Sequence, residues 1–172
     1  MIRRFVVALV ALLGLTTQSA LAIPGQTPAQ LLAWGKSNAA LPGFKPTMDE
    51  NTGGTVYMAR LKIDGLDADF SSEPTNGVAR QEYISFQGVG DPWNLSKHMS
   101  IARDAIRTVY GADYLADFTS AKVVPLHGRV VAWQGKRLAY SIFGGAIFMI
   151  RNADFPAVLK NIHTCDGIDC ED

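Results

Sequence analysis

The sequence predicts an α+β domain in which two β-meanders form one antiparallel sheet, with helices packed mainly on one face. Three features support this prediction. Two segments, 55–87 and 129–151, are rich in β-branched and aromatic residues and contain glycine turns. Between them, residues 95–110 repeat apolar side chains at the spacing of an amphipathic helix. The expected order of elements is α-βββ-α-(β)βββ-α.

The first 22 residues are expected to be a secretory signal peptide. Arg3 and Arg4 form a basic start, residues 5–15 form an apolar run, and small residues end the segment at Ala22. The run is shorter than the roughly 20 residues that cross a bilayer, so a retained anchor is the less favoured alternative. Cleavage would leave residues 23–172 as a single domain that is secreted or periplasmic.

The charge of the mature chain does not favour binding to nucleic acid. Loss of Arg3 and Arg4 would leave 14 basic residues against 16 acidic ones. A slightly acidic balance gives no attraction to phosphate backbones or anionic lipids. The mature part also has no second apolar stretch long enough to span a membrane.

A capped helix and a charge-paired hairpin are expected in the first half. Thr27 and Pro28 are typical of the N-cap and first position of a helix, which should fade near residues 38–41. Residues 42–54 are read as a loop. A turn at Asp64-Gly65 would then join strands 55–63 and 66–71. That register predicts the pairs Arg60–Asp69, Lys62–Asp67, Leu61–Ala68 and Ala59–Phe70, and strand 79–87 follows after a turn at 72–78.

Segment 129–151 is expected to form three strands with two-residue turns at Gln134-Gly135 and Gly144-Gly145. This places Val131 opposite Leu138 and Ile142 opposite Ile147. Alternation then gives one face with small residues and one bulky face. The small-residue face carries Val130, Ala132, Ala139, Ser141, Phe143, Ala146, Phe148 and Ile150. The bulky face carries Arg129, Val131, Trp133, Leu138, Tyr140, Ile142, Ile147, Met149 and Arg151.

Three shorter elements and two covering helices complete the predicted fold. Residues 113–118 should form a short turn, 123–126 an edge strand, and 155–162 a last helix. Helix 95–110 is expected to cover the small-residue face, and the first helix, with Trp34, is the evident cover for the bulky face.

The bulky face supplies the candidate contact residues. Aromatic, methionine and arginine side chains are enriched at protein interfaces. The candidates are Arg129, Trp133, Tyr140, Met149 and Arg151. The alternative is that they are core residues beneath the first helix, since apolar sheet residues are more often core than site.

Two cysteines lie near the C-terminus and are expected to form a disulfide that pins the tail. Cys165 and Cys170 are separated by a bend at Asp166-Gly167, and exported chains meet oxidising conditions. The alternative adds His163 as a third metal ligand. Its spacing is wider than metal sites prefer and a fourth ligand is not evident, so no metal is predicted.

No catalytic or cofactor motif stands out in the sequence. The segment Gly88-Val89-Gly90 has Trp93 where a dinucleotide loop needs its third glycine, so no cofactor is expected. His98 and His127 fall in no recognised motif. They are the bases around which a hydrolase-like cell-envelope enzyme would have to assemble its site.

The function predicted from the sequence is therefore a small secreted or periplasmic binding domain. Its partner would be an unidentified protein or a small apolar ligand, and a homodimer is possible. The alternatives are the hydrolase-like enzyme and an assembly or chaperone-like protein. The last would accept a partner strand at the edge near residues 123–126.

Processing is the first prediction. The exported protein is expected to begin at Ile23, because the small residues that end the leader match what signal peptidases cleave. N-terminal sequencing of the purified protein checks this. A mature N-terminus that retains residues 5–15 would contradict it.

The disulfide is the second prediction. The intact mass of the exported protein should rise by about two hydrogens on reduction, because one S–S bond is cleaved to two thiols. Alkylation before reduction should leave both cysteines unmodified. Labelling of either thiol in the unreduced protein would rule the bridge out.

Overall fold

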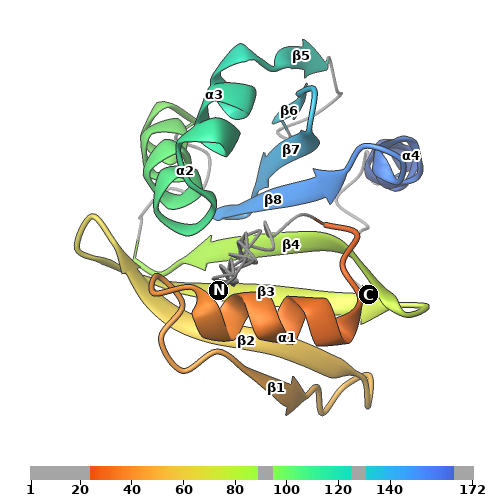
Figure 1. The fold of residues 1–172 in the computed structure, drawn as a ribbon. Coiled ribbons are helices and arrows are strands. Elements are labelled where there is room, and N and C mark those ends of the chain that lie inside the picture. The colour runs from red at the N-terminus through yellow and green to blue at the C-terminus, as the bar shows by residue number, and fades with distance from the viewer. Residues whose placement is uncertain (1–23, 89–94, 125–130, 165–172) are drawn as a thin grey trace, which may run out of the picture.

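A computed structural model describes residues 24–88, 95–124 and 131–164 of the chain (Figure 1). The helices are α1 (Pro28–Ser37), α2 (Leu95–Tyr110), α3 (Ala112–Ser120) and α4 (Phe155–Thr164). The strands are β1 (Lys45–Met48), β2 (Thr55–Ile63), β3 (Leu66–Thr75), β4 (Val78–Phe86), β5 (Lys122–Val124), β6 (Val131–Gln134), β7 (Leu138–Phe143) and β8 (Ala146–Arg151).

All eight strands form one antiparallel sheet in the order β1-β2-β3-β4-β8-β7-β6-β5. The first four strands make one meander and the last four make another, which confirms the α+β class and the two-meander architecture. The meanders meet where β4 pairs with β8, with Glu82 opposite Met149 and Ile84 opposite Ile147. Residues from distant parts of the chain therefore lie side by side in the middle of the sheet.

The β2–β3 hairpin has the predicted register. Asp64 and Gly65 both have positive φ, at 48° and 81°, as a type I′ turn requires. Arg60 lies opposite Asp69 and Lys62 opposite Asp67. Their side chains form ion pairs at 3.6 Å and 2.7 Å, respectively. Because these pairs are largely solvent-exposed, they fix register more than they add stability.

Three elements differ from the prediction. Residues 45–48, read as loop, form the edge strand β1 because they pair with the start of β2. Strand β3 continues to Thr75 through a bulge and turns at Asn76-Gly77. The expected turn at 113–118 is the nine-residue helix α3, which buries Tyr114 and Phe118 against the sheet.

The predicted β6–β7 register is wrong. Val131 lies opposite Ile142 rather than Leu138, because residues 135–137 form a longer connection between the strands. The turn between β7 and β8 does have two residues, with Phe143 opposite Ala146. The register error involves an even number of residues, so every side chain keeps its predicted face.

The helices divide between the two faces of the sheet. Helices α1, α2 and α3 share one apolar cluster with the bulky face, and α4 forms a second cluster on the small-residue face (Figure 1). The prediction that helix 95–110 covers the small-residue face is therefore wrong. Its Ile106 and Val109 pack on the bulky face, while Phe155 of α4 packs on Ala139 and Ile150.

Helix α1 is joined to the first meander by aromatic packing. Thr27 caps the helix and exchanges hydrogen bonds with Gln30 in a capping box, which confirms the predicted start. The Trp34 ring stacks on Tyr110 of α2 at 6.0 Å and lies 5.8 Å from Phe70. Gly35, the next residue of α1, must lack a side chain, because a Cβ there would lie 2.1 Å from the Phe44 ring.

Candidate functional site

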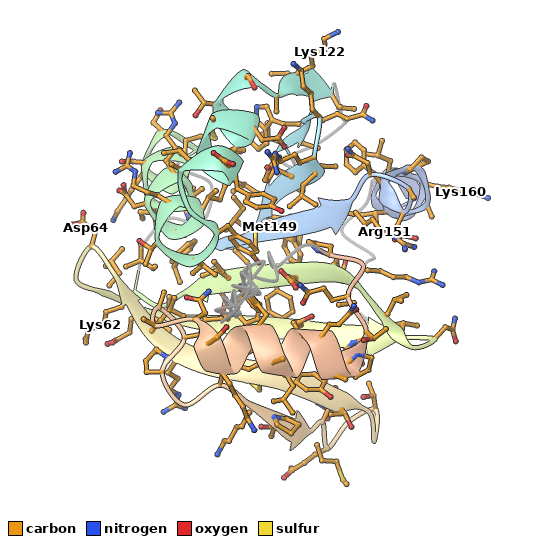
Figure 2. The ribbon with its side chains drawn as sticks, in the orientation of Figure 1. Lys62, Asp64, Lys122, Met149, Arg151 and Lys160 are labelled. Carbon is orange, nitrogen blue, oxygen red and sulfur yellow. The ribbon has the colours of Figure 1, made fainter. Side chains whose placement is uncertain are left out.

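The structure places three of the five predicted contact residues in the core. Tyr140 and Met149 are 0% exposed and Trp133 is 7% exposed. Figure 2 shows Met149 in the interior, with Lys122 and Lys160 pointing outward. Phe118 of α3 contacts the rings of Trp133 and Tyr140 at 5.5 Å and 4.9 Å. This burial favours the alternative that the three are core residues, although the described ring contacts on Trp133 and Tyr140 come from α3 rather than from the first helix.

The two predicted arginines are not brought together with these residues. Arg129 lies outside the described residues. The guanidinium of Arg151 donates to Asp154 at 3.0 Å, at the start of α4. This hydrogen bond holds the pKa of Asp154 below its usual range. Arg80 of β4 lies 3.9 Å from the same carboxylate. Asp154, which directly precedes α4, is thus paired with arginines of both β4 and β8.

A buried acid lies on the same sheet face and was not singled out from the sequence. Glu82, in the central strand β4, is 0% exposed. The Tyr110 hydroxyl at the end of α2 donates to its Oε2 at 2.6 Å. Ser72 lies directly opposite Glu82 on β3 and is also fully buried. Within the described residues, Glu82 Oε1 and Ser72 Oγ have no hydrogen-bond partner.

Burial raises the pKa values of both Glu82 and Tyr110. Burial raises the pKa of Glu82 from 4.5 to about 7, and the hydrogen bond from Tyr110 only partly offsets that rise. Burial and the nearby Glu82 charge raise the pKa of Tyr110 well above its ordinary value. The pair therefore gives the core one group that changes charge near neutral pH, although titration does not by itself make it catalytic.

A second buried acid, Asp117 of α3, binds the β6–β7 connection. Its Oδ1 accepts from the backbone N–H groups of Lys136 at 2.8 Å and Arg137 at 3.1 Å. Its Oδ2 accepts from Leu138 N–H at 3.2 Å and from the Tyr140 hydroxyl at 2.9 Å. The Leu138 amide and the Tyr140 hydroxyl are buried and the other two donors are partly buried, so the carboxylate stabilises this three-residue connection.

Gly135 completes the same arrangement. A Cβ at this position would lie 2.3 Å from Asp117 Oδ2, so any side chain would displace the carboxylate. Asp117 therefore explains why the two-residue turn predicted at Gln134-Gly135 does not form. The function of this group is structural, because its oxygens are occupied by groups of the chain itself.

The histidines give mixed outcomes for the enzyme hypothesis. His98 is 1% exposed on α2, so it is a core residue rather than the boundary residue that its sequence position indicated. His127 lies outside the described residues, and the His163 side chain is not described either. In the described part of the chain, no three His, Cys, Asp or Glu side chains are grouped to hold a metal ion. Cys165 and Cys170 also lie outside that part.

The small-residue face carries an accessible apolar surface, which we call the aromatic patch and define as Met58, Tyr83, Phe143 and Phe148. Met58, Tyr83 and Phe148 lie in one cross-strand row through β2, β3, β4 and β8. The Tyr83 and Phe148 rings are 5.5 Å apart. Met58 is 37% exposed, Phe143 is 49% exposed, and both rings of the central pair are partly exposed.

Comparison with known proteins gives no assignment: no family model, curated protein or solved structure matches the chain. Among the residues that the structure describes, none of the helices has the length and apolar character needed to cross a membrane.

The sequence contains signals for both buried acids. Glu82 alternates with Ile84 along β4 and therefore falls on its apolar face, where a carboxylate is unusual. Asp117 precedes Phe118 and lies one helical turn after Tyr114, so it belongs to the buried side of α3. Two members of the aromatic patch, Phe143 and Phe148, belong to the predicted small-residue face, but helix 95–110 was expected to cover that face.

The Asp117 arrangement generates the third prediction. Asp117→Ala should lower the free energy of unfolding by about 3 kcal/mol, because four donors, two of them buried, lose their acceptor. Asp113→Ala is the matched control on the same helix, since its ion pair with Arg137 is largely exposed. It should change stability by no more than about 0.5 kcal/mol. Urea unfolding measures both, and equal effects would contradict the assigned role.

Proposed function

We propose that the mature chain is a secreted or periplasmic binding domain that contacts a partner protein through the aromatic patch. The basic, apolar and small-residue segments of residues 3–22 support the export part of this proposal. The unequal cover of the two sheet faces supports the binding part. Helices α1, α2 and α3 pack on the bulky face, and α4 packs on only part of the other.

The observation that carries the proposal is the partly exposed Tyr83–Phe148 pair in the middle of a sheet face. Aromatic side chains of this kind contribute strongly when a partner removes them from water. Met58 extends the patch towards the β1 edge. Phe143 extends it towards the β7–β8 turn.

The charges beside the patch indicate the kind of partner. Arg60 and Lys62 share this face and are each matched by an aspartate of the same hairpin. The surface beside the patch is therefore close to neutral, which fits an uncharged, mainly apolar protein segment better than a phosphate-rich one. A row of side chains along a sheet also suits a protein surface more than an enclosed small ligand.

The assembly alternative is less well supported by the edges of the sheet. Strand β5 has three residues and includes Lys122, and Pro125 follows it in the sequence. Strand β1 at the other edge has four residues and includes Lys45 and Pro46. Short edges with lysine and proline disfavour the addition of a partner strand. The enzyme alternative would have to recruit His98 from the core.

Photo-crosslinking tests the proposal and is the fourth prediction. A benzophenone amino acid at position 58 or 83 should give a covalent adduct of discrete mass in the exporting cell. The same probe at position 103 is the matched control, because Arg103 is exposed on α2, which packs on the other face. Met58→Lys should reduce the adduct at position 83 by roughly tenfold, because it introduces an unpaired charge into the contact.

The controls separate the possible outcomes. Met58→Lys should leave thermal unfolding nearly unchanged, because the Met58 side chain is already exposed. An adduct with twice the mass of the chain would assign the patch to a homodimer instead. Equal adducts at positions 58, 83 and 103, or none, would contradict the proposal.

A further inference from the structure

Among the described residues, the Glu82 carboxyl has one polar contact with a helix, and that helix is α2. The Tyr110 hydroxyl that donates to it belongs to the last residue of α2. The Tyr110 ring also stacks on Trp34 of α1, and Asn38 after α1 donates to the Val109 carbonyl at 2.9 Å. The end of α2 is thus the point at which α1, α2 and the sheet meet.

The contacts of Glu82 suit a protonated carboxyl better than an ionised one. A buried carboxylate needs several donors, and among the described residues this one has a single donor, from Tyr110. A protonated carboxyl would bring a donor of its own. Ser72 lies opposite Glu82 on β3 and is uncharged, so it adds no charge that would stabilise a carboxylate.

We propose that the Glu82 carboxyl is a pH-sensitive latch: α2 stays closed on the sheet while the carboxyl keeps its proton, and loss of the proton to solvent favours opening of α2, because the cost of a buried charge outweighs the stronger hydrogen bond from Tyr110. The charged oxygen would then remain in the core with its one donor and with no partner for Oε1. The lowest-energy response is to admit water, and α2 is the element that must move to admit it.

The groups that face Glu82 support this assignment. Tyr110 from α2 is the titratable group in direct contact, and its own pKa is raised. Ser72 from β3 and Met149 from β8 are uncharged. Burial raises the pKa of Tyr114 of α3, and Arg137, its nearest cation, opposes that rise. No cation therefore stabilises the ionised form within the described surroundings.

The raised pKa of Glu82 determines how the stability of the folded protein changes with pH. The folded protein holds the Glu82 proton up to a pH of about 7, whereas the unfolded chain releases it near 4.5. Below the lower value both states are protonated, and above the upper value both are ionised. The contribution of this group to stability is therefore largest below about 4.5 and is lost as the pH rises through that window.

A carboxyl carbon NMR titration is the direct test and the fifth prediction. Glu82 should titrate near pH 7, well above the ordinary glutamate value of 4.5. Tyr110→Phe should move the Glu82 midpoint further upward, because the lost hydrogen bond favoured the ionised form. A Glu82 midpoint near 4.5 would overturn the proposal.

Amide exchange tests the movement of α2. Comparing the wild type with Glu82→Gln at the same pH cancels the intrinsic pH dependence of exchange, and glutamine imitates the protonated carboxyl. At pH 8 the Val109 and Tyr110 amides should exchange at least about tenfold faster in the wild type than in E82Q, and at pH 5 at similar rates. Glu73→Gln is the matched control and should behave as the wild type. The same ratio of wild-type to E82Q exchange rates at pH 5 and pH 8 would overturn the latch. If E82Q does not fold, the NMR titration of the wild type and Y110F remains the test.

Discussion

The pairing of β4 with β8 is the constraint on which the rest of the structure depends. Each meander could form its own hairpins, but a four-stranded meander with one apolar face needs a cover and a neighbour. The β4–β8 pairing makes one sheet of the two and places Ile84 and Ile147 side by side at its centre. It also aligns the bulky faces of both meanders, so that α1, α2 and α3 can share a single core.

The two buried acids have different relations to this core. Asp117 receives four hydrogen bonds and fixes how α3 meets the β6–β7 connection. Glu82 receives one and keeps an oxygen without a partner among the described residues. Fully paired buried acids are typical of structural roles, whereas an underpaired one retains a free-energy cost that protonation can relieve. That difference is why the latch is assigned to Glu82 and not to Asp117.

Local patterns predicted much of the fold, and long-range contacts account for what they missed. The Asp64-Gly65 turn and its paired charges act within one hairpin, so the register there could be derived from adjacent residues. The β6–β7 register depends on Asp117, which approaches from another element, and no spacing rule within 129–151 contains that information. Likewise, periodicity identified helix 95–110 but could not show which sheet face it covers, because both faces are apolar. The candidate contacts Trp133, Tyr140 and Met149 failed as a surface for the same reason.

The short edge strands have a consequence for the protein at high concentration. An exposed strand edge is a template on which another chain can add, and continued addition builds aggregates and fibrils. Here both outer strands are three or four residues long, and both carry a lysine. Pro46 cannot donate a ladder hydrogen bond on one side, and the strand on the other side has only the three described residues Lys122, Val123 and Val124. Addition of further strands is thus disfavoured at both edges of the described sheet, which protects the folded chain against aggregation through those edges.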